Sequence, residues 1–443
     1  MRKKTIIAII AVAGLLLTAC AAKSEAPEDS DSTSIPSTPV GDAAQWVLDE
    51  MNADDDTTAT AWESRLSAQF QAEVGAEDVA SLINTQIRPA RPLEVTAYRG
   101  TETEAVVTVA GALGEPFDLS ISIDDDQLIG GLFLGPVTPQ RTPAVSNDDV
   151  AERLGALPLT ARVLVQIDDE TIMSIDEKAP APLGSVFKLY VLEALAEAVS
   201  AGDISWNDNI TVTDAVRSLP SGDLQNLPDG TDVTVQDAAT KMIAISDNTA
   251  TDMLVELLGR EAVEHAVEAG NHHEPELMHP FLTTREMFDL VWGGHVDLQD
   301  AWADGDESVR REVLEVLRTR EFQIDVDDID ERVAWQYGLE WFASAQDIAE
   351  LHAILAQHGD ADPVIRTALS ENPGVVVDPA AWPSVSYKGG SNLGVITGSW
   401  RAVRADGSIM TVVVLGSDAE PIDAETEAEL FAIASDLFAI NAG

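Results

Sequence analysis

Cysteine and basic residues are the scarcest features of this 443-residue sequence. Its one cysteine, Cys20, leaves no partner for a disulfide and no cysteine-based zinc or thiol site in the rest of the chain. Lys and Arg total 26 against 77 Asp and Glu, a formal net charge of -51. Such a charge repels the phosphate backbone, so we expect no nucleic-acid partner. The acids are spread along the chain, and we interpret them as a solvated surface.

The amino terminus carries the one long apolar run of the sequence. Arg2, Lys3 and Lys4 precede residues 6–17, and Leu-Thr-Ala-Cys20 follows. This layout predicts a signal peptide over residues 1–20, and the last four residues resemble a bacterial lipobox. The resemblance implies a lipid on Cys20 that anchors the protein to the outer face of the cell membrane. An uncleaved membrane helix is the alternative, which so short a run barely permits.

Residues 21–137 divide into two segments of different composition. Residues 21–40 are mainly Ser, Pro, Glu, Asp and Thr, which predicts a flexible acidic linker. Residues 41–137 predict a small α+β domain, with helices at 43–51 and 58–71 and strands at 93–98, 105–110, 117–123 and 128–134. The order resembles the cone-like fold of steroid isomerases and transport-factor-like domains. We interpret it as a scaffold, joined to the rest by a linker at 138–149.

Residues 150–443 predict a second α+β domain. Its strands come from both ends of the segment, at 161–167, 171–175, 385–387, 394–404 and 409–415, and a helix at 424–440 follows. Between them lies a mostly helical insert, 185–357. The expected fold is a five-stranded antiparallel sheet with flanking helices and an all-helical lobe.

Three short motifs occur in order along this second domain. They are Ser185-x-x-Lys188, Ser246-Asp247-Asn248 and Lys388-Gly389-Gly390. Each triplet is common in unrelated proteins, but after Cys20 the chain has only five lysines, and two of them occupy motif positions. The ordered set therefore predicts one site.

The motif side chains suit acyl transfer by a serine. A serine hydroxyl needs a nearby base, and Lys188 lies one helical turn after Ser185. Burial, together with the charge of Lys388, would lower the pKa of Lys188 so that it accepts a proton. Ser246 would relay that proton. The backbone N–H groups of Ser185 and Ser391 would stabilise the oxyanion.

The ordered motifs resemble those of class A β-lactamases and penicillin-binding proteins. The segments 224–231, 242–250 and 281–286 extend the resemblance over most of residues 150–443. It implies a β-lactamase-like fold, an acyl-enzyme on Ser185 and a small-molecule substrate (a β-lactam, peptide or ester), with no cofactor and no metal. The two-domain layout is similar to the serine hydrolase of the clavulanic-acid gene cluster and to actinobacterial lipoproteins.

Asn248, Gly390 and Ser391 are the substrate-binding residues that the resemblance implies, but the sequence departs from the family at two places. Lys388-Gly389-Gly390 lacks the usual middle hydroxyl residue, for which Ser391 could substitute. Glu274, in Glu-Pro-Glu-Leu, resembles the deacylating glutamate of the family, but Met278 follows where the partner Asn is expected. Two interpretations of Glu274 stay open: a deacylating base, or a loop carboxylate facing water.

Three functions remain open at this point. The first is a hydrolase acting on β-lactams or related amides and esters. The second is a D,D-peptidase or esterase that β-lactams only inhibit, and the third is a non-hydrolytic binding protein on the same fold. Arg401 or Arg404 is a candidate ligand for a substrate carboxylate. His272, His273 and His279 lack the helical spacing of a zinc site, so we predict no metal there.

Overall fold

The structure is a computed structural model that describes residues 34–443, except for 113–115, 125, 138–140, 169, 323 and 325. The predicted signal peptide 1–20, its Cys20 and most of the predicted linker 21–40 lie outside the described residues. The chain forms two compact units, Met1–Thr142 and Pro143–Gly443. Within the described ranges, every helix is too short or too polar to cross a membrane.

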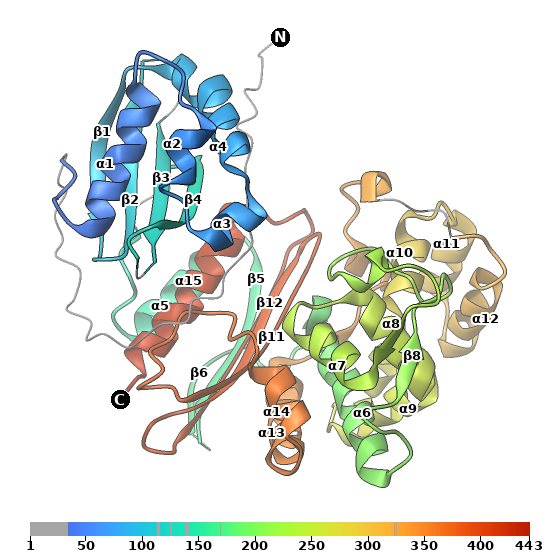
Figure 1. The fold of residues 1–443 in the computed structure, drawn as a ribbon. Helices are drawn as coiled ribbons and strands as arrows, with labels where there is room; N and C mark the ends of the chain where they lie inside the picture. The colour runs from blue at the N-terminus through green and yellow to red at the C-terminus, as the bar shows by residue number, and fades with distance from the viewer. Residues whose placement is uncertain are drawn as a thin grey trace. The chain divides into compact units, whose positions relative to one another are not determined.

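The amino-terminal unit is built on a four-stranded antiparallel meander (Figure 1). Its strands follow one another in sequence and in space: β1 (Leu93–Gly100), β2 (Glu104–Gly111), β3 (Phe117–Ile123) and β4 (Ile129–Pro136). Val107, Val109, Leu119 and Ile121 are buried in the core of this unit. Helix α1 (Pro39–Asn52) covers the sheet and contributes Val47 to the same core.

The helices of this unit differ from the prediction in three ways. The helix predicted at 58–71 is two helices, because Leu66 forms a β-bridge with Ile129 and the Ser67 hydroxyl caps a new helix start. Helix α1 begins at Pro39, two residues inside the predicted linker. Residues 76–90 form turns of helix that the sequence analysis missed. The segments after α1 are α2 (Ala59–Glu63), α3 (Ala68–Glu73), α4 (Ala76–Leu82), the π-helix η1 (Ile83–Ile87) and η2 (Arg88–Ala90).

A five-stranded antiparallel sheet forms the centre of the carboxy-terminal unit, as predicted. Its order in space is β11 (Ser384–Asn392), β12 (Val395–Val403), β13 (Ile409–Ser417), β5 (Thr160–Ile167) and β6 (Glu170–Ile175). Strands from the two ends of the segment therefore pair, β13 with β5. Strand β11 is longer than predicted and contains the whole Lys388-Gly389-Gly390 motif.

The two faces of this sheet bury different layers, because neighbouring residues of a strand point to opposite sides. Val163 and Val165 of β5 pack with Leu437 and Phe438 of α15 (Ala424–Ile440). Helix α5 (Asn147–Ala156) also covers that face; the sequence analysis placed its first residues in the linker 138–149. The opposite face joins the core of the helical lobe, through residues such as Leu164 of β5.

The helical lobe lies between β6 and β11 in sequence. Its helices are α6 (Lys188–Ala201), α7 (Val235–Ala244), α8 (Asn248–Leu258), α9 (Arg260–Ala269), α10 (Thr284–Trp292), α11 (Val296–Asp304), α12 (Glu307–Leu317), α13 (Ala345–Ala361) and α14 (Pro363–Ser370). Short pieces connect them: β7 (Ala181–Pro182), η3 (Gly184–Phe187), β8 (Asn209–Thr211), η4 (Leu224–Asn226), β9 (Asp232–Thr234), η5 (Pro275–Met278), η6 (Val326–Asp328), η7 (Ala334–Tyr337) and β10 (Phe342–Ala343). The pairing of β7 with β10 brings the segment just before Phe342 next to the turn that carries Ser185.

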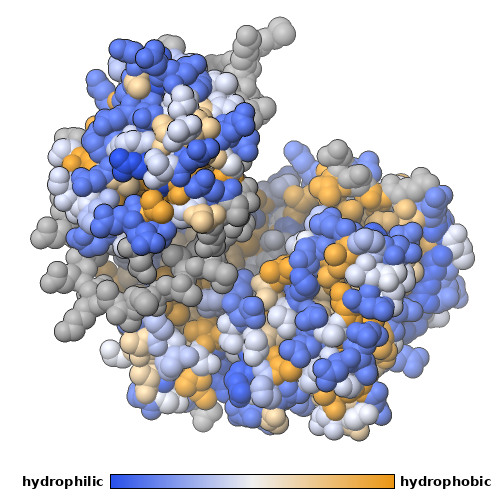
Figure 2. Space-filling model, in the orientation of Figure 1, coloured by the Kyte–Doolittle hydropathy of each residue, from blue (hydrophilic) through white to orange (hydrophobic). Residues whose placement is uncertain are grey.

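The visible surface of each unit is largely hydrophilic (Figure 2). Apolar residues are scattered among polar ones, in agreement with a solvated acidic surface.

Candidate active site

Ser185 lies in the tight turn η3, which is packed directly against strand β11. Gly184 has a positive φ of 50°, and a Cβ there would come within 2.9 Å of the Ser391 nitrogen. A Cβ on Gly390 would come within 2.5 Å of the Ser185 nitrogen. Both positions therefore require glycine, and the backbone nitrogens of Ser185 and Ser391 lie at the same close junction.

The hydroxyl of Thr397, on the neighbouring strand β12, contacts both sides of this junction. Its hydroxyl lies 2.7 Å from the Leu183 carbonyl oxygen and 3.1 Å from that of Gly390. The turn before Ser185 and the strand before Ser391 are thus tied to one buried hydroxyl. This fixes the two backbone N–H groups relative to each other.

The hydroxyl of Ser246 joins the two motif lysines. Lys188 Nζ lies 3.2 Å from Ser246 Oγ, and Lys388 Nζ lies 3.0 Å from the same oxygen. Lys188 also donates to the Ser246 carbonyl at 2.6 Å and Lys388 to the Gly389 carbonyl at 2.6 Å. Residues from three distant parts of the chain therefore form one hydrogen-bonded row, amine to hydroxyl to amine.

Burial lowers the proton affinity of both amines. Lys188 is 0% exposed and Lys388 is 2% exposed. Burial lowers the pKa of Lys188 to about 7, against the opposing charges of Asp252 and Asp247. Burial lowers the pKa of Lys388 well below its usual value, and the charge of Lys188 lowers it further. Two amines bonded to one hydroxyl titrate as a pair, and both lowered pKa values favour a state with an uncharged amine.

Ser246 is held in an unusual backbone conformation. Its φ is 58°, in the left-handed region that non-glycine residues seldom adopt. Asp247, the next residue, caps α8 by accepting from Ala250 N and accepts the backbone N–H groups of Asp223 and Leu224. The aspartate of the motif thus holds a neighbouring loop and fixes the turn that aims Ser246 at the lysines.

Both polar atoms of the Asn248 side chain are hydrogen-bonded within the protein, which the sequence did not predict. Its Oδ1 accepts from Lys188 Nζ at 2.7 Å, and its Nδ2 donates to the Leu219 carbonyl at 3.0 Å. It also lines the pocket described next. The side chain therefore positions Lys188 as well as facing a ligand.

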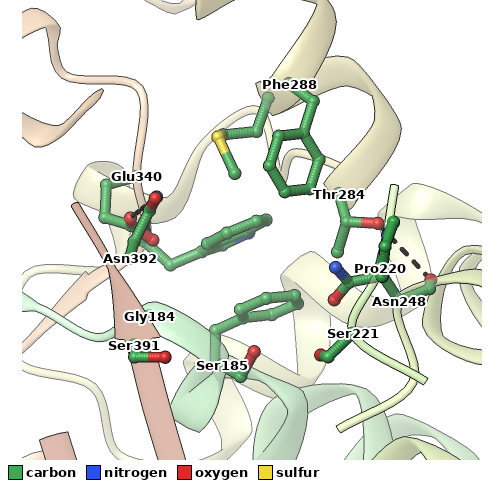
Figure 3. Close-up of a pocket in the computed structure, with 13 residues that line it drawn as sticks. Gly184, Ser185, Pro220, Ser221, Asn248, Thr284, Phe288, Glu340, Ser391 and Asn392 are labelled. Atoms are coloured by element: carbon green, nitrogen blue, oxygen red, sulfur yellow. Dashed lines mark hydrogen bonds between the residues drawn. The ribbon is translucent and has the colours of Figure 1, made fainter. Parts of the chain in front are cut away.

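A pocket opens directly above Ser185 (Figure 3). Glu340 and Asn392 lie at its left in that view, Ser221 and Asn248 at its right. Its apolar wall includes Phe187 stacked on Trp341, with ring centroids 3.6 Å apart. The lining residues are Gly184, Ser185, Phe187, Pro220, Ser221, Asn248, Thr284, Met287, Phe288, Glu340, Trp341, Ser391 and Asn392.

In the structure, the predicted base Lys188 does not hydrogen-bond the predicted nucleophile Ser185. Among the hydrogen bonds of the described residues, none joins Ser185 Oγ to Lys188 Nζ; Lys188 instead bonds Ser246 and Asn248. Gly390 does not line the pocket but lies behind the Ser185 nitrogen. Ser391 is exposed and does line it. The site therefore has Ser185 and Ser391 at its surface and the lysine row beneath.

Three other predicted site residues lie away from this pocket. Glu274 is exposed at the start of η5 and is not a lining residue. Arg401 and Arg404 do not line the pocket either. Arg401 is near Asp360 and Asp168, while Arg404 lies over the ring of Trp382. Neither arginine is placed to bind a carboxylate beside Ser185.

Glu340, Asn392 and Ser221 line the pocket but were not predicted from the sequence. Glu340 is 3% exposed, and burial raises its pKa to about 7. A lone carboxylate in the otherwise apolar run 339–343 was the signal that could have shown it. Ser221 donates to the Ser246 carbonyl at 2.7 Å, and only the Pro and Gly on either side of it hinted at a loop.

Two of the three histidines near Glu274 have side-chain hydrogen bonds, whereas His279 Nε2 is buried without a hydrogen-bond partner among the described residues. His272 Nε2 lies 2.8 Å from the Phe342 carbonyl, and His273 is paired with Asp347. Over the part of the chain that the structure describes, no group of three or more His, Cys, Asp or Glu is arranged to hold a metal ion.

Two family models match the chain, one in each unit. Residues 150–358 match the "Beta-lactamase enzyme family". Residues 35–129 match the family described as "ORF 12 gene product N-terminal". The carboxy-terminal unit therefore has a β-lactamase-like fold and is similar to that family over the matched residues.

Several solved structures are similar to this chain at low identity. A β-lactamase from Sphaerobacter thermophilus is 19% identical, with 65% of this chain and 95% of that one covered and a TM-score of 0.45. A β-lactamase from Chitinophaga pinensis is 18% identical (66% and 97% covered, TM-score 0.46), and PBP-A is 16% identical (68% and 98% covered, TM-score 0.46). No curated protein matches the chain. At these identities, the likenesses say nothing about the substrate.

Proposed function

We propose that the carboxy-terminal unit is a serine hydrolase that forms an acyl-enzyme on Ser185, with a β-lactam or a related amide or ester as substrate. The observation that carries this proposal is the row Lys188–Ser246–Lys388. Its two amines are buried, share one hydroxyl and have lowered pKa values, beneath a serine that faces a pocket. This arrangement supplies a neutral amine, which serine acyl transfer needs.

Acylation follows from these positions. Ser185 Oγ attacks the substrate carbonyl carbon while Lys188, one turn away on α6, takes the hydroxyl proton. The carbonyl oxygen becomes an oxyanion at the backbone N–H groups of Ser185 and Ser391. The C–N or C–O bond then breaks, and the proton passes through Ser246 Oγ to the leaving atom. The acyl group remains on Ser185 as an ester.

A D,D-peptidase or esterase that β-lactams only inhibit is the second candidate. Two observations favour it: Glu274 lies outside the pocket, and the Lys388-Gly389-Gly390 motif has no hydroxyl at its middle position. Both would weaken turnover of a β-lactam more than acylation by it. A binding protein without hydrolysis is the third candidate, and the intact lysine row argues against it.

For the rest of the chain we propose a supporting role. Lipidation of Cys20 would hold the protein on the outer face of the cell membrane, with residues 21–40 as a tether. The amino-terminal unit would be a cone-like scaffold without chemistry of its own. The two-domain layout supports a relationship with the serine hydrolase of the clavulanic-acid gene cluster.

Intact-mass spectrometry over time tests the proposed function. Full-length protein is mixed with a fluorescent penicillin, a chromogenic cephalosporin and p-nitrophenyl acetate in turn. We expect a mass increase of one acyl group, located on Ser185, and none in Ser185→Ala. Ser200→Ala, which removes an exposed serine of α6 outside the pocket, is the matched control and should still be acylated. Full labelling of Ser185→Ala would refute the proposal, and the persistence of the adduct separates a hydrolase from an inhibited peptidase.

A further inference from the structure

The pocket contains a carboxylate that the proposed acylation does not use. Glu340 lines it together with Ser185, and this glutamate is the one acidic residue among the lining residues. Glu274, the carboxylate expected from the sequence, is exposed at the start of η5. We propose that Glu340, and not Glu274, activates the water that releases the acyl group from Ser185. This inference rests on the proposed function.

Glu340 is held by the same two segments that carry the backbone N–H groups of Ser185 and Ser391. Asn392, the residue after Ser391, donates its side-chain amide to Glu340 Oε2 at 2.9 Å. On the other side, the Trp341 carbonyl accepts the backbone N–H of Leu183 at 2.9 Å, two residues before Ser185. The carboxylate is therefore fixed relative to the carbon that water must attack.

Packing of Trp341 adds to this positioning. Its ring stacks on Phe187, two residues after Ser185, and its Nε1 donates to the Leu282 carbonyl at 3.1 Å. Trp341, the residue next to Glu340, is thus held at one ring face and at one ring edge. Glu340 cannot move far from Ser185 without breaking these contacts.

The environment of Glu340 suits a base at neutral pH. Among the described residues, its two oxygens accept only from Asn392 and from the backbone N–H of Trp341, at 2.9 and 3.3 Å, so lone pairs remain for a water. Burial raises its pKa to about 7, and the two hydrogen bonds oppose that shift. Within the described ranges, no charged side chain is hydrogen-bonded or ion-paired to Glu340. A carboxylate whose pKa is near 7 is a stronger base than one with the ordinary carboxyl pKa.

The deacylation step balances as follows. A water between Glu340 and the ester gives one proton to the carboxylate as its oxygen bonds to the acyl carbon. The resulting tetrahedral oxyanion collapses, the C–Oγ bond breaks, and Ser185 Oγ takes a proton from the lysine row. The acid product leaves, Glu340 gives its proton to solvent, and the lysine row takes up one proton from solvent to replace the one it gave to Ser185.

Glu340→Gln separates this role from others, with Glu274→Gln as the matched control. With the three acylating probes named above, we expect Glu340→Gln to acylate at a rate within about threefold of wild type. Release should slow by roughly 100-fold or more, so the adduct accumulates. Release in wild type and in Glu274→Gln should rise with pH around a midpoint near 7. In Glu340→Gln that dependence should be lost, and added hydroxylamine, a nucleophile that needs no base, should restore release.

Distinct outcomes overturn distinct claims. If Glu340→Gln releases the acyl group at the wild-type rate, or only raises the KM for acylation, this inference is wrong while the proposed function stands. Slow release in Glu274→Gln with normal release in Glu340→Gln would restore the original expectation. If no probe acylates Ser185, the proposed function itself fails. Should Glu340→Gln not fold, Glu340→Asp, which draws the carboxylate back by one methylene, is expected to slow release with the pH dependence retained.

Discussion

Buried charged side chains have different partners in the amino-terminal unit and in the pocket region of the carboxy-terminal unit. In the amino-terminal unit Arg88 donates to the carbonyls of Glu50 and Asp54, and Asp118 accepts from Arg99 and from the Thr108 hydroxyl. In the pocket region Lys188, Lys388 and Glu340 have only carbonyl, hydroxyl and amide partners among their hydrogen bonds.

The energetic consequence follows from the cost of burying an uncompensated charge. Dense hydrogen bonding to a charged group offsets its loss of water, so the amino-terminal groups stabilise their unit. Burial lowers the pKa values of the two lysines, despite the charges of Asp252 and Asp247 near Lys188, and raises the pKa of Glu340. Such groups cost stability, and pKa values of about 7 for Lys188 and Glu340 are typical of a reactive site.

The largest effect is expected from removing the base. Lys188→Met keeps the length of the side chain but cannot accept a proton, so acylation of Ser185 should slow by roughly 1,000-fold. Stopped-flow fluorescence with a fluorescent penicillin measures this rate, and circular dichroism checks the fold. A loss of less than tenfold would mean that Lys388 alone can act as the base.

A second prediction concerns how stability depends on pH. The folded pKa of Glu340, about 7, exceeds the ordinary value of 4.5. Ionisation of this group therefore lowers the free energy of unfolding progressively as the pH rises from the lower value to the higher one. Glu340→Gln removes that cost. Its stability relative to wild type should increase by about 2.5 kcal/mol between pH 5 and pH 8.5. Urea unfolding followed by tryptophan fluorescence at the two pH values measures this.

The same chemical change should act in the opposite direction in the other unit. Asp118→Asn loses a carboxylate that accepts from Arg99 and Thr108, and should destabilise the amino-terminal unit by about 1–2 kcal/mol at pH 8.5. If both amide variants changed stability alike, the contrast between the two units would not hold.

Arg88 tests whether a well-partnered buried charge is structural. Arg88→Met removes two hydrogen bonds to backbone carbonyls and should lower the free energy of unfolding by about 2 kcal/mol. The acylation rate of the folded protein should not change, because Arg88 belongs to the other unit. Thermal unfolding and the stopped-flow assay measure the two quantities, and an altered rate would show that the two units are coupled.

The smallest effect is expected at an exposed lysine. Lys241 pairs with Asp223 at 2.7 Å near the surface, so Lys241→Ala should change stability by less than about 0.5 kcal/mol. Acylation should stay within twofold of wild type. A large loss of acylation in Lys241→Ala would show that the assay responds to the loss of any lysine. The result with Lys188→Met could then not be assigned to the buried position of Lys188.

Most of the fold could be predicted because it depends on local patterns. Alternating apolar residues marked β2, β3, β5 and β13, and the three motifs identified the β-lactamase-like order of elements. The predicted helix at 58–71 was wrong because Leu66 pairs with Ile129, a contact between residues far apart in sequence. Local propensity has no information about such a partner.

The sequence by itself determined which chemical groups are present: one cysteine, very few lysines, and Ser185, Lys188, Ser246 and Lys388 in a recognisable order. Only the tertiary structure decided what those groups do to one another. The pKa of an amine or a carboxyl depends on how much water and which dipoles surround it, and these come from segments hundreds of residues apart. For that reason the sequence motif pointed to Glu274. The position of Glu340 in the pocket depends on the pairing of β7 with β10 and on the hydrogen bond from Asn392, which only the tertiary structure shows.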